Sequence, residues 1–268
     1  MQAYIDTDQR LHLLAQMLTK ANRAYVMHED DDSHTNLFFD PISKSIYGRW
    51  KPTQNGRALL TIDLSNYCFK WLDDNWQVLC DIPFRDKTVS EIENGLAEHL
   101  PTIGLMGNAF KEELHYELPS YDFSNHPFKA LIDTAVVDWM CYRQLANEAC
   151  YSILGHLQVP SEVRIWPHHF DTGIYVQPNK QLGVGFGLAM QDSLVDVPYF
   201  YLSAYELGDV SLNYSSFSTL QHGEWKLSEH FKGAIFRLDE MAKIEPALRH
   251  PCIFIFIYET MQWYLKQC

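Results

Sequence analysis

One long helical pattern in the middle of the chain, over residues 126–155, most restricts the folds open to it. Its apolar side chains recur at spacings of three and four, which places them on one face of a helix: Phe128, Leu131, Ile132, Ala135, Trp139, Tyr142, Leu145, Ala149 and Ile153. Pro127 suits the first turn, and Gly155 and Pro160 end the pattern. A helix of about 30 residues spans about 45 Å. We therefore predict a central helix against which the rest of the chain packs.

Two β-prone regions flank that helix. Residues 36–81 consist of short runs separated by turn signals, among them Asn55 and Gly56, and predict an antiparallel meander of about four or five strands. The second region predicts strands over residues 162–166, 170–177, 181–188 and 198–205, and a short one over 225–227. Alternation along a strand places Tyr199, Tyr201, Ser203 and Tyr205 on one face of the 198–205 segment.

The remaining segments favour helices. Apolar spacing predicts a helix that ends near Met27, and a capping box from Thr88 to Glu91 opens another, which Pro101 should end. Helices are also expected over 231–241 and from Pro251 onward. The order predicts an α+β fold with two antiparallel β-meander regions packed with helices around the long helix. No linker divides the chain, so residues 1–268 are expected to form a single domain, and two similar halves, 1–122 and 123–268, remain an alternative.

Composition narrows the classes of partner. The formal charge of −13 disfavours nucleic acid and anionic membrane, because both are bound by clustered Lys and Arg. No signal peptide and no transmembrane helix is visible, so a cytoplasmic location is expected. The six cysteines lack C-x-x-C and zinc-finger spacings, which favours reduced, buried thiols. A homo-oligomer remains open.

Several motifs of the second β region resemble those of one bacterial family. They are Trp166, Phe170 with Asp171, Gly185 with Phe186, and the 198–205 run Pro-Tyr-Phe-Tyr-Leu-Ser-Ala-Tyr. In these motifs the chain is similar to the proteins grouped as domain of unknown function 5996. His34 stands where that family has a His before its first strand, but Thr35 and Asn36 replace the expected paired Trp residues. The family has no established activity, so the resemblance implies a fold and no reaction.

The most specific chemical pattern is the run from Trp166 to Asp171. His168, His169 and Asp171 place two imidazoles and a carboxylate within four residues, and these groups can bind a divalent metal or transfer a proton. In an extended chain His169 and Asp171 point to the same side. We predict His169 as base or metal ligand, Asp171 as its orienting group or co-ligand, and His168 as a reserve. The alternative is structural, with Asp171 accepting backbone N–H groups and both histidines donating to carbonyls.

A ligand pocket is predicted beside this run. Tyr199 and Tyr201, together with Trp166 and Phe186, would line it with aromatic rings and hydroxyl groups, and His34 is a further candidate. Glycines at 183, 185 and 187 lack the G-x-G-x-x-G spacing and indicate a close backbone or ligand approach. The predicted function is a small-ligand site or a metal-assisted hydrolytic one. The alternative is a non-catalytic interaction protein with an aromatic sheet face.

Overall fold

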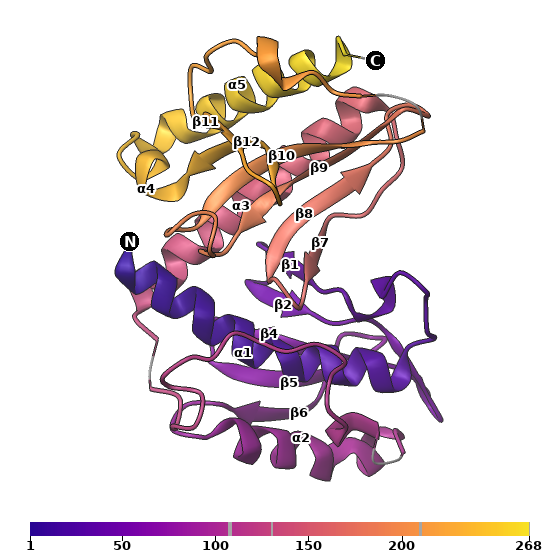
Figure 1. Ribbon diagram of the computed structural model, residues 1–268. Coiled ribbons are helices and arrows are strands. Elements are labelled where there is room, and N and C mark those ends of the chain that lie inside the picture. Colours follow the sequence, from indigo (N-terminus) through magenta and orange to yellow (C-terminus); the bar gives the residue numbers. More distant parts are fainter. Residues whose placement is uncertain (107–108, 130, 209–210, 268) are drawn as a thin grey trace. The chain divides into compact units, whose positions relative to one another are not determined.

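The computed structural model describes residues 1–106, 109–129, 131–208 and 211–267, and it has the predicted α+β class with two antiparallel sheets (Figure 1). The chain divides into two compact units, which we describe separately. Unit 1 comprises Met1, Tyr142–Val163 and Asp171–Cys268, and unit 2 comprises Gln2–Cys141 and Arg164–Phe170. This division differs from halves at 1–122 and 123–268, and whether the two units act as one domain stays a prediction.

Unit 2 contains a sheet in the order β1-β2-β4-β5-β6, with β3 paired to β4. Its strands are β1 (Phe38–Asp40), β2 (Ser45–Tyr47), β3 (Lys51–Thr53), β4 (Gly56–Asp63), β5 (Cys68–Asp73) and β6 (Val78–Pro83). In Figure 1, α1 (Gln2–Tyr25) lies across this sheet and α2 (Val89–Ile103) lies beside β6. The unit also contains β7 (Arg164–Trp166), the short helices η1 (Ser33–Thr35) and η2 (Ala109–Lys111), and the start of α3 (Asp133–Leu157).

The core of unit 2 follows from the predicted apolar spacing. Leu11, Ala15, Leu18 and Ala21 of α1 have no exposed surface, as is expected for a helix face turned toward a sheet. The capping box at Thr88 is confirmed, since its side chain accepts from the Glu91 N–H and the Glu91 carboxylate accepts from the Thr88 N–H. Gly104, at φ 86°, caps the helix.

Unit 1 contains a sheet in the order β11-β12-β10-β9-β8. Its strands are β8 (Asp171–Val176), β9 (Leu182–Ala189), β10 (Tyr199–Glu206), β11 (Glu224–Leu227) and β12 (Lys232–Arg237). The remainder of α3, η3 (Tyr214–Ser216), α4 (Leu238–Met241) and α5 (Pro246–Leu265) complete the unit. Phe186 and Phe200 stack on the face that forms the core, with ring centroids 6.2 Å apart.

Several sequence predictions about these elements were wrong. The first β region has six strands and not four or five, and the last helix begins at Pro246 and not at Pro251. Lys232–Arg237 is strand and not helix, because it pairs along β10, and only Leu238–Met241 is helical. Helix α3 begins at Asp133 and not near 126, because the Phe128 backbone exchanges hydrogen bonds with the Asp86 N–H and the Lys87 carbonyl. Helix α2 continues through Pro101 to Ile103.

Two general properties of the described residues bear on the predicted class. No helix within the described ranges is long and apolar enough to cross a membrane. The five cysteines that the structure describes are all free. Cys68 and Cys150 are buried as expected, whereas Cys141 is exposed. Cys268 lies outside the described residues.

Candidate functional site

The predicted histidine pair lies in unit 2, on a turn that follows β7. His168 and His169 are both exposed, and their ring centroids are 4.2 Å apart. The carbonyl of the preceding residue, Pro167, lies 2.9 Å from His12 Nε2 and 2.9 Å from Gln16 Nε2, both on α1. These two hydrogen bonds to one carbonyl hold the turn against α1. They therefore fix the position of the histidine pair that follows Pro167.

His12 has defined hydrogen-bond roles because a carbonyl oxygen can only accept. Its Nε2 must carry the proton that is donated to Pro167, and its Nδ1 therefore accepts from the Tyr121 hydroxyl at 2.7 Å. The ring stacks on Phe170 with centroids 5.3 Å apart. Since His12 is only 1% exposed, it is a supporting group beneath the turn.

Further imidazoles surround the same turn. Tyr116 lies next to His168, at a centroid distance of 5.7 Å, and next to His115, at 5.1 Å. The Tyr116 hydroxyl donates to Gln16 Oε1 at 2.6 Å, and burial raises the pKa of this hydroxyl. His115 Nε2 lies 2.9 Å from an oxygen of Asp32, which connects this group to the acidic loop before η1.

His34 belongs to that loop and lies against His28, with ring centroids 4.8 Å apart. It is 4% exposed, and burial, followed by the charge of His28, lowers the pKa of its imidazole. Its Nδ1 accepts from the Glu29 N–H at 3.2 Å, so the neutral ring carries its proton on Nε2. In this tautomer His34 offers a hydrogen-bond donor and not a metal-binding lone pair.

The four exposed imidazoles of this region are named the histidine surface: His28, His115, His168 and His169. The buried His34 lies against His28. Of the predicted residues, the structure brings His168 and His169 together, and Tyr116 relates His168 to His115. Over the described ranges, no group of three or more His, Cys, Asp or Glu side chains is arranged to hold a metal ion. Asp171 belongs to unit 1 and His169 to unit 2, so their joint metal or acid–base role stays a prediction.

Asp171 lies on a second surface, which we name the tyrosine face: Asp171, Tyr175, Tyr201, Ser203 and Tyr205. These residues belong to β8 and β10, on either side of the glycines of β9. A Cβ atom at Gly183 would lie 2.4 Å from the Tyr175 hydroxyl oxygen, and one at Gly187 would lie 2.9 Å from that of Tyr201. The glycines therefore allow tyrosines of the neighbouring strands to lie over β9.

The Tyr201 hydroxyl donates to Asp171 Oδ2 at 2.6 Å. Burial and the neighbouring Asp171 carboxylate both raise the pKa of Tyr201 well above its usual value, so this hydroxyl remains a donor at neutral pH. In the part of the chain that the structure describes, no cationic side chain pairs with Asp171. Among the described residues, the carboxylate therefore has one neutral donor, the Tyr201 hydroxyl. The backbone N–H groups that the structural alternative predicted do not donate to it within this part of the chain.

Of the other predicted ligand residues, Tyr199 lies on the same side of β10 as Tyr201, with ring centroids 6.4 Å apart, as predicted. Phe186 is fully buried and opposite Leu202, so it faces the core and not the tyrosine face. Tyr199 is also buried and donates to Asp192 at 2.8 Å. Trp166 belongs to unit 2. The sequence alternation places Ser203 on the side of Tyr201 and Tyr205, but Ser203 was not predicted as a site residue.

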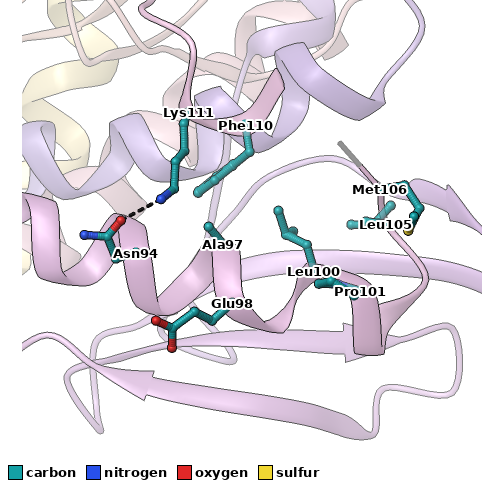
Figure 2. A pocket seen from close by; sticks show the side chains of 9 residues that line it. All are labelled: Asn94, Ala97, Glu98, Leu100, Pro101, Leu105, Met106, Phe110 and Lys111. Carbon is teal, nitrogen blue, oxygen red and sulfur yellow. Dashed lines mark hydrogen bonds between the residues drawn. The ribbon is translucent and has the colours of Figure 1, made fainter. Parts of the chain in front are cut away.

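A pocket that the sequence did not indicate lies between α2 and η2 in unit 2 (Figure 2). Its volume is about 350 Å³. It is lined by Asn94, Ala97, Glu98, Leu100, Pro101, Leu105, Met106, Phe110 and Lys111. At one end Lys111 Nζ donates to Asn94 Oδ1 at 2.6 Å. The only sequence signal for it was the α2 spacing, which predicted a helix face and not what covers it.

Comparisons of the chain with protein-family models, with curated proteins and with solved structures find no match. The resemblance to domain of unknown function 5996 therefore stays a prediction.

Proposed function

We propose that this protein binds a small organic amine on the tyrosine face of unit 1. The observation that carries the proposal is the Asp171 carboxylate, whose only hydrogen-bond partner in the described chain is the Tyr201 hydroxyl. A carboxylate beside aromatic rings attracts a cation both by its charge and through the ring faces. The amine would place its ammonium group at Asp171, where the described residues offer no competing cation.

The exposed end of the face suits an apolar body on the same ligand. Tyr175 and Tyr205 meet edge to face with centroids 5.7 Å apart, and they are 42% and 51% exposed. The Tyr205 ring lies near Gly185, and the Tyr201 hydroxyl lies near Gly187. Positions two residues apart on a strand are separated by about 7 Å. An arylalkyl amine of this length would reach from the carboxylate to the tyrosine rings.

Ser203 supports a polar contact midway along the face. The residue is 5% exposed and lies between Tyr201 and Tyr205 along β10. It lies between Gly185 and Gly233 in the sheet, neither of which has a side chain to cover it. A Cβ atom at Gly185 would lie 3.5 Å from Ser203 Oγ, so this hydroxyl is directed toward the glycine positions. A ligand hydroxyl or amine on the face would be placed to hydrogen-bond with it.

The test is calorimetric titration of the full chain with 2-phenylethylamine and with its neutral analogue 2-phenylethanol. We expect the amine to bind at least tenfold more tightly than the alcohol. Asp171→Asn should remove that preference, because the amide still accepts from Tyr201 but has no charge. Glu229→Gln, which removes an exposed carboxylate of the same unit, is the matched control and should keep the preference. Equal binding of amine and alcohol, or of the amine to wild type and Asp171→Asn, would exclude the proposal.

A further inference from the structure

We infer that the pocket between α2 and η2 binds a small carboxylate with an apolar body. This site is independent of the tyrosine face, because all its lining residues belong to unit 2 and none of them was predicted to be functional. The inference rests on the shape of the pocket, on its apolar lining, and on an ammonium group at one end.

The pocket has an apolar floor of suitable size. Leu100, Leu105 and Phe110 are each at most 4% exposed and form its deepest described side chains. Ala97 and Pro101 come from one face of α2, as their spacing of four residues requires. A volume of about 350 Å³ falls at the lower end of the range for small-molecule sites.

The polar end of the pocket offers donors. Lys111 is exposed, and within the described ranges Asn94 is its hydrogen-bond partner and no carboxylate pairs with it. An ammonium group has three N–H donors and Lys111 uses one, while the Asn94 Nδ2 group has no described acceptor. Figure 2 shows both side chains meeting at the same end of the pocket. The remaining N–H groups of the Lys111 ammonium can donate to a carboxylate oxygen at this end of the pocket.

The single acidic lining residue does not oppose this assignment. Figure 2 shows the Glu98 carboxylate turned away from Phe110 and Lys111, and the residue is exposed. Glu98 and Lys111 are both exposed, so water screens both charges, but the hydrogen bond to Asn94 holds the Lys111 ammonium at the end of the pocket. An alkylammonium ligand in the same orientation would meet Lys111 with like charge. The chemistry of the pocket thus favours an apolar carboxylate over the matching amine or alcohol.

The experiment uses the ¹⁵N-labelled full chain and three probes of equal length, namely hexanoate, hexan-1-ol and hexylamine. We expect hexanoate to bind most tightly and to shift backbone amide signals within residues 94–111. Lys111→Met keeps the apolar stem and removes the charge, and should weaken hexanoate binding by about tenfold or more, since a hydrogen bond to a charged group contributes about that much. It should leave hexan-1-ol binding unchanged.

Two further variants make the result decisive. Lys129→Met removes an exposed lysine of the same unit outside the pocket and should bind hexanoate as the wild type does. Ala97→Leu fills the cavity from α2 and should weaken both hexanoate and hexan-1-ol. The inference is overturned if hexanoate does not bind or binds no better than hexan-1-ol or hexylamine. It is also overturned if Lys111→Met and Lys129→Met are alike, or if the amide shifts lie outside residues 94–111.

Discussion

Lys51 Nζ donates to Asn22 Oδ1 at 2.7 Å in the interior of unit 2, where neither side chain has any exposed surface. A second bond, also 2.7 Å long, goes to the carbonyl of Arg49. No carboxylate pairs with Lys51 in the described chain, so its charge would be buried without a counter-ion. Burial, and to a lesser extent the charge of Arg49, lowers the pKa of this amine to about 7.

Lys51 is therefore expected to make stability depend on pH. Between the folded pKa of about 7 and the usual value of 10.5, the unfolded amine binds a proton that the folded amine does not, so the free energy of unfolding rises with pH through this window. Lys51→Met removes this dependence. Denaturant unfolding at pH 7.5 and pH 9 should show wild type gaining roughly 1–2 kcal/mol relative to Lys51→Met. Parallel pH profiles for the two proteins would show that the amine titrates normally.

His12 is expected to support the turn that carries His168 and His169. His12→Phe keeps a ring against Phe170 but leaves the Tyr121 hydroxyl without its acceptor, and the Pro167 carbonyl keeps only Gln16. Loss of a buried hydrogen-bond partner costs about 1–3 kcal/mol, and urea unfolding should show a decrease of that size.

His99→Phe is not a matched control, because His99 is half-buried and bonds to the Gly95 carbonyl of its own helix. His230→Phe removes an exposed imidazole with no described partner and should change stability little. If His12→Phe and His230→Phe are equally stable, the bonds to Tyr121 and Pro167 contribute nothing measurable.

The parts of the fold that were predicted correctly are those with local signals. The apolar stripe of α1 and the capping box at Thr88 depend on residues within a few positions of one another. The strand state of Lys232–Arg237 depends instead on pairing with Tyr199–Ser203, whose residues lie 30 to 38 positions earlier in the chain. A short segment that contains Ile235 and Phe236 is compatible with helix or strand. Its secondary structure is therefore decided by pairing with β10.

The same distinction applies to the candidate sites. Alternation placed Tyr201 and Tyr205 on one face, and that local inference holds in β10. That Phe186 does not belong to the tyrosine face follows from the register between β9 and β10, which places it opposite Leu202. This register cannot be predicted from the sequence alone. The burial of Lys51 and His12 was missed for a related reason, because isolated polar residues are usually exposed and only the packing of α1 reveals otherwise.

Two glycines of β9 provide a matched pair. A Cβ atom at Gly187 would lie 2.6 Å from the Thr172 carbonyl oxygen, so backbone must move to admit it. A Cβ atom at Gly185 would lie 3.4 Å from its nearest neighbour, the Tyr205 ring edge, which is exposed and can shift. We expect Gly187→Ala to lower the free energy of unfolding by about 1–3 kcal/mol. Gly185→Ala should stay within about 0.5 kcal/mol of wild type. Equal effects would mean that β8 and β9 adjust freely.

The Tyr201–Asp171 hydrogen bond is expected to contribute measurably to the free energy of unfolding, although both residues are only partly buried. Tyr201→Phe leaves the half-buried carboxylate without its described donor, whereas Asp171→Asn retains an acceptor for the hydroxyl. Tyr201→Phe should therefore lower the free energy of unfolding by about 1 kcal/mol or more at neutral pH, and Asp171→Asn by less. Tyr258→Phe, which removes a 63% exposed hydroxyl, controls for the loss of the group itself. If Asp171→Asn proves less stable than Tyr201→Phe, the result would contradict a hydrogen bond in which Tyr201 is the donor.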